Sequence, residues 1–355
     1  MLKNFWYACE FSSEVTHQPK QIVMLNQRFV VYRNSQGQVI ALKDQCPHRG
    51  AALSLGWVEG DCIRCPYHGW KFQADGRCID IPANAPEVPI PKKAIATSYP
   101  VRESQGFIWL FYGDLPEAER HPLPTFPAYL STKMHAAYND EIECANYARL
   151  MEVNLDFAHV VAIHRKSFGQ RVPMNKQIKY RVQEDAWSGV AQFSYDSLGD
   201  SKTVLNLLLG GRPEFTTTLT YYLPNITLAE IHVGGKGKNA IKIGILVAYL
   251  PIDEKTSRSK RVFYRNFLTL PWLDGWARKL DYAMGHEDTV VVETLAEQPM
   301  PRISEELHVA ADALALSFRK QQQKYLAKGW GLESSRHPLT SATEDATQPV
   351  TSLVN

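Results

Sequence analysis

Two pairs of cysteine and histidine are the residues of this 355-residue chain that most clearly point to chemistry. The first pair is Cys46-Pro-His48, the second is Cys65-Pro-Tyr-His68, and sixteen residues separate them. One thiolate and one imidazole on each of two tight loops suit a [2Fe–2S] cluster, with cysteines on one iron and histidines on the other. Neutral imidazole makes such a cluster less negative, so it accepts an electron more readily. The two pairs therefore predict a centre for one-electron transfer.

The same four side chains are also the donor types of a Cys2His2 zinc site, which stays open as an alternative. Zinc motifs usually keep the two cysteines together and the two histidines together. Each loop here carries one of each, and this interleaving favours the iron–sulfur arrangement called a Rieske centre. Glycines follow both pairs, at Gly50 and Gly69, and allow backbone amides to turn toward the sulfurs.

The composition is that of an ordinary soluble globular protein, with 45% hydrophobic and 21% charged residues. A formal net charge of +2 indicates no general attraction to nucleic acid or to anionic lipid. No apolar segment of signal-peptide type opens the chain, and the longest strongly apolar run, Ile243 to Leu250, is too short to span a membrane. We therefore expect a cytoplasmic protein. The other four cysteines are expected to be thiols, with a disulfide near the cluster, at Cys62 and Cys78, as an alternative.

Length and changes in composition predict two domains and a tail. Residues 1–115 carry short β-rich runs bounded by turns, which predicts an all-β domain from which the two cysteine–histidine loops project. A proline-rich linker, Pro116 to Pro127, opens the second domain at residues 116–332. Residues 333–355 are rich in serine, threonine, proline and acidic residues, which predicts a disordered tail.

The second domain is predicted to be α+β, with one antiparallel sheet flanked by helices. The β-rich runs lie between residues 176 and 270, and helical patterns cover residues 146–159, 273–297 and 304–328. Trp272 and Trp276 are expected to be core aromatics. The last helix is expected to have Ser304 as its N-cap, Gly329 as its stop and an apolar face of Leu307, Ala311, Leu314 and Phe318.

A second group of candidate metal ligands, Asp156, His159 and His164, lies within nine residues of a predicted helix. Two histidines and one carboxylate with open coordination positions are the ligand set of non-haem Fe(II) oxygenases. On an ideal α-helix the two histidines lie about 140° apart, so the helix must end between them or carry a π-bulge to place both on one ion. Asp156 and His159 share a face. Two ordinary histidines, one capping and one buried, are the alternative.

Residues 46–68 and 156–164 together give the chain its resemblance to the oxygenase component of the Rieske non-haem iron oxygenases, over about residues 1–330. It looks most like the group of vanillate O-demethylase and dicamba monooxygenase, and more distantly like chlorophyllide a oxygenase. The resemblance implies a Rieske cluster on the first motif, a mononuclear Fe(II) on His159 and His164, and O2 as co-substrate. One departure is visible, because Val153 stands where family members often carry asparagine, with Asn154 one place later.

The resemblance also implies a third iron ligand from a carboxylate on a late helix, and Asp288 is the matching residue. From the residues alone, Glu287 and Glu293 remain alternatives, because any of these carboxylates can bind the ion. A solvated acidic helix face is a further reading of this segment.

The activity implied is that of an EC 1.14 terminal oxygenase, either a monooxygenase or an oxidative demethylase. Such an enzyme takes electrons from a separate NAD(P)H-dependent reductase or a ferredoxin, since this chain has no nucleotide-binding fingerprint after a strand. The resemblance implies a head-to-tail homotrimer in which His68 of one chain meets Asp156 of the next. Asp156 would then be the electron bridge, with its carboxylate bonded both to that imidazole and to His159.

Two other functions remain open, a Rieske-type electron carrier and a ring cis-dihydroxylating dioxygenase. A carrier has no need of His159, His164 and Asp288, whereas a dioxygenase shares them. The substrate is expected to be a small organic molecule, aromatic or largely apolar. Its contacts are not identified, and the candidate polar side chains are Asn206, Tyr221, His232 and Arg265.

Overall fold

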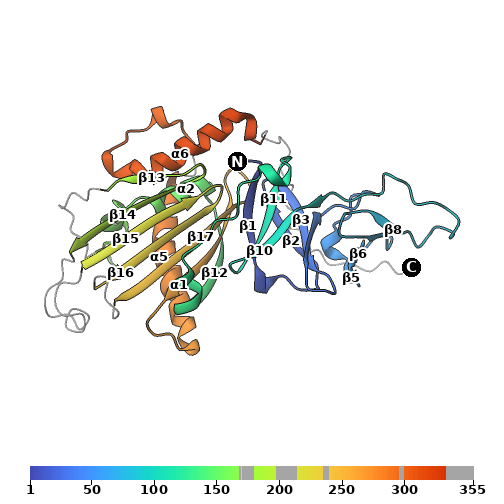
Figure 1. The fold of residues 1–355 in the computed structure, drawn as a ribbon, viewed down its shortest axis with the longest axis horizontal. Helices are drawn as coiled ribbons and strands as arrows, with labels where there is room; N and C mark the ends of the chain where they lie inside the picture. The colour runs from blue at the N-terminus through green and yellow to red at the C-terminus, as the bar shows by residue number, and fades with distance from the viewer. Residues whose placement is uncertain (168, 170–179, 197–213, 235–239, 296–299, 333–355) are drawn as a thin grey trace, which may run out of the picture.

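A computed structural model describes residues 1–332 except 168, 170–179, 197–213, 235–239 and 296–299. Figure 1 shows two lobes side by side, a β-rich N-terminal lobe and a larger lobe in which helices cover one broad sheet. The predicted tail, residues 333–355, lies outside the described residues.

Three small antiparallel sheets form the N-terminal lobe, in the strand orders β1-β11-β10, β2-β3-β4-β9 and β5-β6-β7-β8. The strands are β1 (Phe5–Phe11), β2 (Lys20–Met24), β3 (Gln27–Arg33), β4 (Val39–Lys43), β5 (Trp57–Glu59), β6 (Cys62–Arg64), β7 (Lys71–Phe72), β8 (Cys78–Asp80), β9 (Ser98–Tyr99), β10 (Val101–Ser104) and β11 (Phe107–Tyr112). The short 3-10 turns of this lobe and of the linker are η1 (Ser12–Glu14), η2 (Leu53–Leu55) and η3 (Glu117–Glu119).

The two cysteine–histidine loops project from adjoining sheets. The first loop follows β4, and the second joins β6 to β7. Val30, Leu42, Ile63 and Phe72 are fully buried in one cluster that joins these two sheets. Their packing fixes the bases of both loops relative to each other, which a shared metal cluster requires. Cys62 and Cys78 are free thiols, so the alternative of a disulfide near the cluster is not realised.

Two glycines of this lobe allow a test of its backbone geometry. Gly76 has a φ of +84°, and a Cβ there would lie 1.7 Å from the carbonyl oxygen of Ala96. Gly60 has a φ of +66°, but nothing lies within 4 Å of its Cβ position. Gly60→Ala is expected to cost about 1–2 kcal/mol, the penalty of a left-handed conformation. Gly76→Ala is expected to cost about 1–3 kcal/mol more, because its neighbours must move. Denaturant unfolding of the two variants measures the difference, and equal stabilities would contradict this packing.

The second lobe contains a seven-stranded antiparallel sheet in the order β12-β18-β17-β16-β15-β14-β13. Its strands are β12 (His135–Glu143), β13 (Val182–Glu184), β14 (Ser188–Asp196), β15 (Glu214–Tyr222), β16 (Ile226–Val233), β17 (Ile241–Pro251) and β18 (Ser257–Arg265). The helices described here are α1 (Ala128–Lys133), α2 (Tyr147–Leu155), α3 (Val160–Ile163), α5 (Asp274–Leu295) and α6 (Ala313–Tyr325). The shorter turns are η5 (Pro271–Leu273), η6 (Ile303–Glu305), η7 (Ala310–Asp312) and η8 (Leu326–Trp330), a π-helical turn.

Alternation along β17 shows how the sheet is buried on both faces. Leu246 and Ala248 pack in one cluster with aromatic residues of β1 and β11, whereas Val247 and Tyr249 pack in the cluster that includes α2 and α6. Figure 1 shows helices on the second of these faces. The sheet therefore packs against the N-terminal lobe and α1 on one face, and against α2, α6 and further residues of the N-terminal lobe on the other. This is the predicted α+β architecture with an antiparallel sheet.

Three expectations about the helices are wrong. The last helix begins after Asp312, not at Ser304, because two 3-10 turns precede it. The last residue of each turn, Glu305 or Asp312, accepts the backbone amide of the residue just before that turn. Leu307 lies between these turns and is fully exposed, although Leu314 and Phe318 are buried as predicted. Trp272 and Trp276 are 75% and 43% exposed, because Ala277 takes the sheet-facing position at the start of α5.

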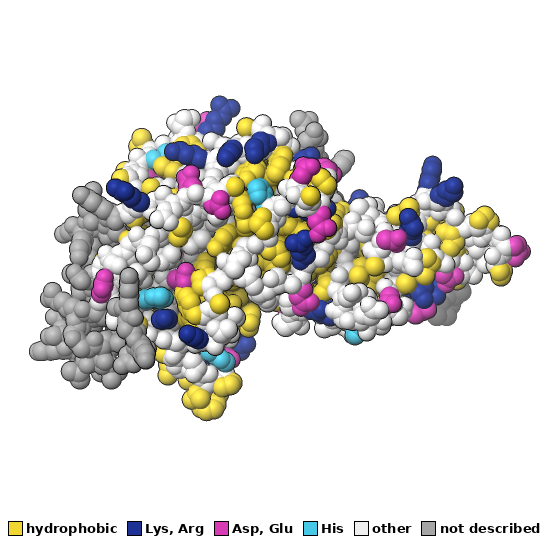
Figure 2. Space-filling model, in the orientation of Figure 1, with side chains coloured by type: hydrophobic (Ala, Val, Ile, Leu, Met, Phe, Trp, Pro, Cys, Tyr) yellow, Lys and Arg dark blue, Asp and Glu magenta, His cyan; other side chains and the backbone are white. Residues whose placement is uncertain are grey.

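The surface carries charges of both signs. On the face in Figure 2, acidic and basic side chains are interspersed, in keeping with the small net charge. The lower tip of the larger lobe, where α5 begins in Figure 1, is hydrophobic. None of the helices in the described part of the chain is long and apolar enough to cross a membrane.

Candidate metal centres

The backbones of the two cysteine–histidine loops repeat one geometry. The Gly50 amide donates to the Cys46 carbonyl at 2.9 Å, and the Gly69 amide donates to the Cys65 carbonyl at 3.0 Å. Both glycines have positive φ, +80° and +71°, which side chains rarely adopt. The identical turns therefore follow from the glycines that come four residues after each cysteine.

The four side chains of these loops divide into an inner and an outer pair. Cys46 and Cys65 are 3% and 1% exposed, whereas His48 and His68 are exposed, with ring centroids 4.8 Å apart. Burial and the adjacent Cys65 raise the pKa of the Cys46 thiol to about 11. A buried thiol becomes a thiolate readily only when a cation compensates its charge, as a metal cluster does. The donor set fits a [2Fe–2S] cluster with sulfur on the inner iron and nitrogen on the outer iron.

The arrangement differs from that of a single zinc ion. Within the part of the chain that the structure describes, one set of three or more donors converges as for a single ion, and it is not this one. A tetrahedral zinc site brings all its donors to one metal at about 2.0–2.3 Å. The division of the donors into two buried sulfurs and two exposed imidazoles fits the two-metal arrangement.

The converging set is His159, His164 and Asp288, whose ligand atoms all lie within 4.8 Å of one another. Asp288 Oδ1 lies 3.5 Å from His159 Nε2 and 3.2 Å from His164 Nε2. His164 is buried, and the other two side chains are nearly so, with 13% and 14% exposed. Two imidazole nitrogens and one carboxylate oxygen at these separations fit a mononuclear Fe(II) that keeps open positions.

A break in the helix brings the two histidines together. Helix α2 ends at Leu155, and α3 is a single turn that lies between His159 and His164. His164 has φ −88° and ψ +21°, so it departs from the helical path. Of the two ways expected to align the histidines, the structure uses a helix that ends before His164.

Hydrogen bonds fix both imidazole rings. His159 Nδ1 lies 2.6 Å from the backbone carbonyl of Asp156, and His164 Nδ1 lies 2.6 Å from Glu287 Oε2. Ser167 Oγ donates to the same Glu287 oxygen at 2.9 Å. With Nδ1 engaged, each ring presents Nε2 to Asp288, and such outer partners set the tautomer of a ligating histidine. Burial lowers the pKa of His159, which favours the neutral form that binds a metal.

The two alternative carboxylates occupy other positions. Glu287 contacts the far side of the His164 ring, and Glu293 Oε1 accepts the amide of Cys144 at 3.3 Å. Neither belongs to the converging set. The pairing of Glu287 with His164 was not expected, and no local signal in the sequence indicates it, since the two residues are 123 positions apart.

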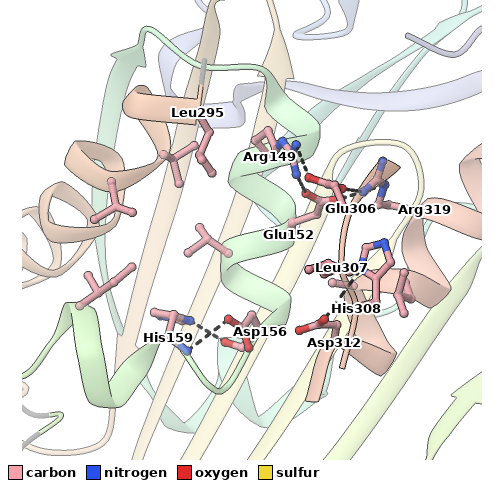
Figure 3. A pocket seen from close by; sticks show the side chains of 16 residues that line it. Arg149, Glu152, Asp156, His159, Leu295, Glu306, Leu307, His308, Asp312 and Arg319 are labelled. Carbon is pink, nitrogen blue, oxygen red and sulfur yellow. Dashed lines mark hydrogen bonds and ion pairs between the residues drawn. The ribbon is translucent and has the colours of Figure 1, made fainter. Parts of the chain in front are cut away.

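The carboxylate of Asp156 makes different bonds from those expected. Its Oδ1 accepts the amide of Ala158 at 2.7 Å and its Oδ2 accepts the amide of His159 at 3.2 Å, so it does not bond to the His159 ring. The backbone carbonyl of Asp156 serves the ring instead. Figure 3 shows Asp156 and His159 side by side at one edge of a cavity, joined by these bonds. Burial raises the pKa of Asp156.

Asp156 and His159 form a wall between two cavities. The outer cavity, of about 340 Å³, also includes Leu307, His308 and Asp312 and is shown in Figure 3. The inner cavity, of about 110 Å³, also includes His164, Asp288 and apolar side chains of the sheet. Asp156 and His159 thus border both the outer cavity and the inner cavity that holds the candidate iron site.

The polar residues suggested as substrate contacts lie elsewhere. Tyr221 is hydrogen-bonded to Ser317, Arg265 is paired with Asp274, and His232 is near Tyr129. None of these three lines the inner cavity, and Asn206 lies outside the described residues. Asn154 does line that cavity, and its amide donates to the Tyr249 hydroxyl at 2.6 Å. Val153 lines the outer cavity.

Comparisons with known proteins match two regions of the chain. Residues 5–100 match the Rieske [2Fe-2S] domain, and residues 144–328 match the vanillate O-demethylase oxygenase C-terminal domain. The chain is similar to 4beta-methylsterol monooxygenase of Methylococcus capsulatus, 31% identical over 74% of this chain and 68% of that protein. The toluene-4-sulfonate monooxygenase iron-sulfur subunit TsaM1 of Comamonas testosteroni is 33% identical over 47% of this chain, a match that spans about half of that relative's length.

The fold is shared with a solved structure. Dicamba monooxygenase bound to 3,6-dichlorosalicylic acid superposes with a TM-score of 0.80 and 23% identity, over 93% of this chain and 99% of that one. The relatives are oxidoreductases, and the cofactors of this group are a Rieske [2Fe–2S] cluster and non-haem iron, with O2 as co-substrate. The chain belongs to the Rieske non-haem iron oxygenases, as an oxygenase component of the vanillate O-demethylase group.

Proposed function

We propose that this terminal oxygenase holds its mononuclear Fe(II) on His159, His164 and Asp288, and its [2Fe–2S] cluster on Cys46, His48, Cys65 and His68. The observation that carries the proposal is the convergence of two Nε2 atoms on Asp288 Oδ1 beside an apolar cavity. A protein that only carried electrons would have no use for this second site. The proposed division is a Rieske domain at 1–115 and a catalytic domain at 116–332, in line with the two matched regions.

The chain's own residues prepare the site for this reaction. When bound, the cluster supplies single electrons and the ferrous ion activates O2. Glu287 and the Asp156 carbonyl hold the two imidazoles in position. The apolar lining of the inner cavity excludes water and orients the substrate next to the ligands. One oxygen atom enters a C–H bond of the substrate and the other leaves as water, with two electrons and two protons consumed.

Electrons are proposed to cross between chains of a head-to-tail homotrimer, from His68 of one chain to Asp156 of the next. In Figure 1, β5 to β8, which adjoin the cluster loops, lie at the outer end of the N-terminal lobe, whereas α2 and α5, which adjoin the iron ligands, lie in the other lobe. The two centres of one chain are therefore far apart, which supports transfer between chains. His68 is exposed, and exposed apolar side chains, Leu307, Val291 and Leu295, surround the outer cavity beside Asp156. A docked partner would bury them.

The substrate is proposed to be a small organic molecule that is hydroxylated, or demethylated when the oxidised carbon is a methoxy or N-methyl group. Electrons are proposed to come from an NAD(P)H-dependent reductase or a ferredoxin. Relatives named for sterol and toluenesulfonate monooxygenation support oxidation of a compound with a hydrocarbon core.

Isotope labelling with a surrogate reductase tests this function. Under 18O2, a panel of small aromatic and apolar compounds is expected to yield a product with one labelled oxygen, or formaldehyde from a demethylated one. Reductant oxidation should depend on the compound supplied. Reduction of the cluster without incorporation by any compound would support the electron carrier instead, and two labelled oxygens in a cis-diol would support the dioxygenase.

Glu287 gives a separate test of the iron site. Glu287→Ala is expected to weaken binding of Fe(II) at the mononuclear site by about 10–100-fold, because the His164 ring loses the partner that orients it. Glu287→Gln keeps an oxygen that accepts from Nδ1 and should retain most of the affinity. Competition with a chelator measures both variants. Wild-type affinity in Glu287→Ala would show that this hydrogen bond does not position the ligand.

A further inference from the structure

The inner cavity beside the candidate iron site has a mostly apolar lining. Its volume of about 110 Å³ is on the scale of a dry cavity that holds benzene, about 150 Å³. The larger apolar residues of its lining include Phe157, Phe215, Leu219, Ile231, Ile245 and Met284. Space of this size and polarity admits at most one small ring.

One wall of the cavity is aromatic. Phe157 lies after α2, Tyr195 lies on β14 and Phe215 lies on β15. The rings of Phe157 and Tyr195 are 5.3 Å apart, and those of Tyr195 and Phe215 are stacked at 5.2 Å with a 10° angle. Three adjoining rings give a planar aromatic ligand offset-stacked or edge-on contacts.

Several polar side chains of the lining outside the candidate iron ligands are bonded to other protein groups. Arg261 is the one lysine or arginine among the described lining residues, and its Nε and Nη2 each lie 3.2 Å from Asp281. Asp281 is fully buried, so this pair is neutralised within the protein. The Asn154 amide donates to Tyr249, and Thr217 interacts with the Tyr195 hydroxyl.

We propose that the substrate is an uncharged, one-ring aromatic molecule and that the site rejects its carboxylate analogues. The inference rests on the proposed function for the position of the iron and adds the charge and size of the substrate. A carboxylate in this cavity would lose its hydration and find Arg261 already paired, and an uncompensated buried ion costs several kcal/mol. A neutral ring loses little hydration and gains contact with the aromatic wall.

Nitrobenzene and benzoate are a matched pair of probes, since the two differ by one charge at nearly constant shape. Calorimetric titration of the holoenzyme without O2 measures their binding without turnover. Nitrobenzene, and benzamide as a second neutral probe, are expected to bind at least about a hundredfold more tightly than benzoate, which corresponds to about 2.7 kcal/mol. Benzoate binding within tenfold of both neutral probes would overturn the inference, as would failure of both neutral probes to bind.

A substitution of Asp281, which does not line the cavity, tests whether the paired state of Arg261 causes the selectivity against benzoate. Asp281→Asn leaves Arg261 without its counter-charge and is expected to narrow the preference for nitrobenzene over benzoate at least about tenfold. Asp140→Asn is the matched control, because it uncouples Arg258 on the same strand away from the cavity and should leave the ratio unchanged. An unchanged ratio in folded Asp281→Asn would overturn the role of Arg261, and if this variant does not fold, the wild-type ratio decides.

The two proposals fail separately. Tight binding of the neutral probes, with no oxygen incorporated into any compound of the panel, would contradict the proposed function and leave this inference intact. Oxidation of benzoate in preference to neutral rings would support the proposed function and contradict the inference about substrate charge.

Discussion

Replacing Asp288 with alanine is expected to remove one iron from each chain and to leave the two cluster irons in place. The carboxylate oxygen that faces both histidines disappears, and two imidazoles alone bind Fe(II) weakly. The cluster loops lie in the other lobe and should keep their spectrum. Oxygenation should fall by at least about a hundredfold, since even the loss of an outer partner of a ligand costs 10–100-fold. Iron analysis, sulfide analysis and the spectrum of the reduced cluster measure these effects.

Glu293→Ala is the matched control for this experiment. Glu293 lies on the same helix and was one of the alternative ligands, but its carboxylate accepts the Cys144 amide instead. This variant should retain all its iron. Loss of the mononuclear iron from Glu293→Ala, with retention in Asp288→Ala, would reassign the third ligand.

Asp156→Asn is expected to keep both metal centres and to lose most of its turnover. Asparagine retains an oxygen for the backbone amides, and the carbonyl that holds His159 is unaffected, so the iron site should stay intact. What disappears is the carboxylate charge proposed to receive the neighbouring chain's His68. Turnover should fall by at least about a hundredfold, the scale set by loss of an outer-shell carboxylate. Stopped-flow reduction and reoxidation of the cluster would locate the loss at transfer between the centres.

Asp312→Asn provides the same change in the same outer cavity without touching the ligand turn. Its turnover should resemble that of the wild type. If Asp156→Asn were as active as this control, the bridge would be wrong. Asp156→Ala is the harsher variant, since it also removes the acceptor of the Ala158 and His159 amides.

The cluster loops and the histidine pair could be predicted from the sequence because each is encoded by a short local motif. Each loop needs its cysteine, histidine and glycine within a few residues, and the resulting turns are the same in both. Strands that lack an alternation of buried and exposed residues are harder to predict from sequence. The strand Phe5–Phe11 has no alternation because all seven residues are buried, and β12 at the sheet edge carries Asn, Asp and Glu, which strands disfavour.

Contacts between distant segments were beyond the sequence. The Glu287 partner of His164 and the amide bonds of the Asp156 carboxylate depend on how α3 docks on α5. The exposure of Trp272 and Leu307 has a different cause. A hydrophobic pattern indicates which residues favour burial, but it does not say whether the same chain covers them.

The contents of iron and acid-labile sulfide per chain of the wild-type holoenzyme decide whether the protein holds both metal centres. A cluster on the two loops and one ion on His159, His164 and Asp288 together require about three irons and about two sulfides. About two irons with two sulfides would contradict the mononuclear site and leave an electron carrier. About one zinc without sulfide would contradict both centres.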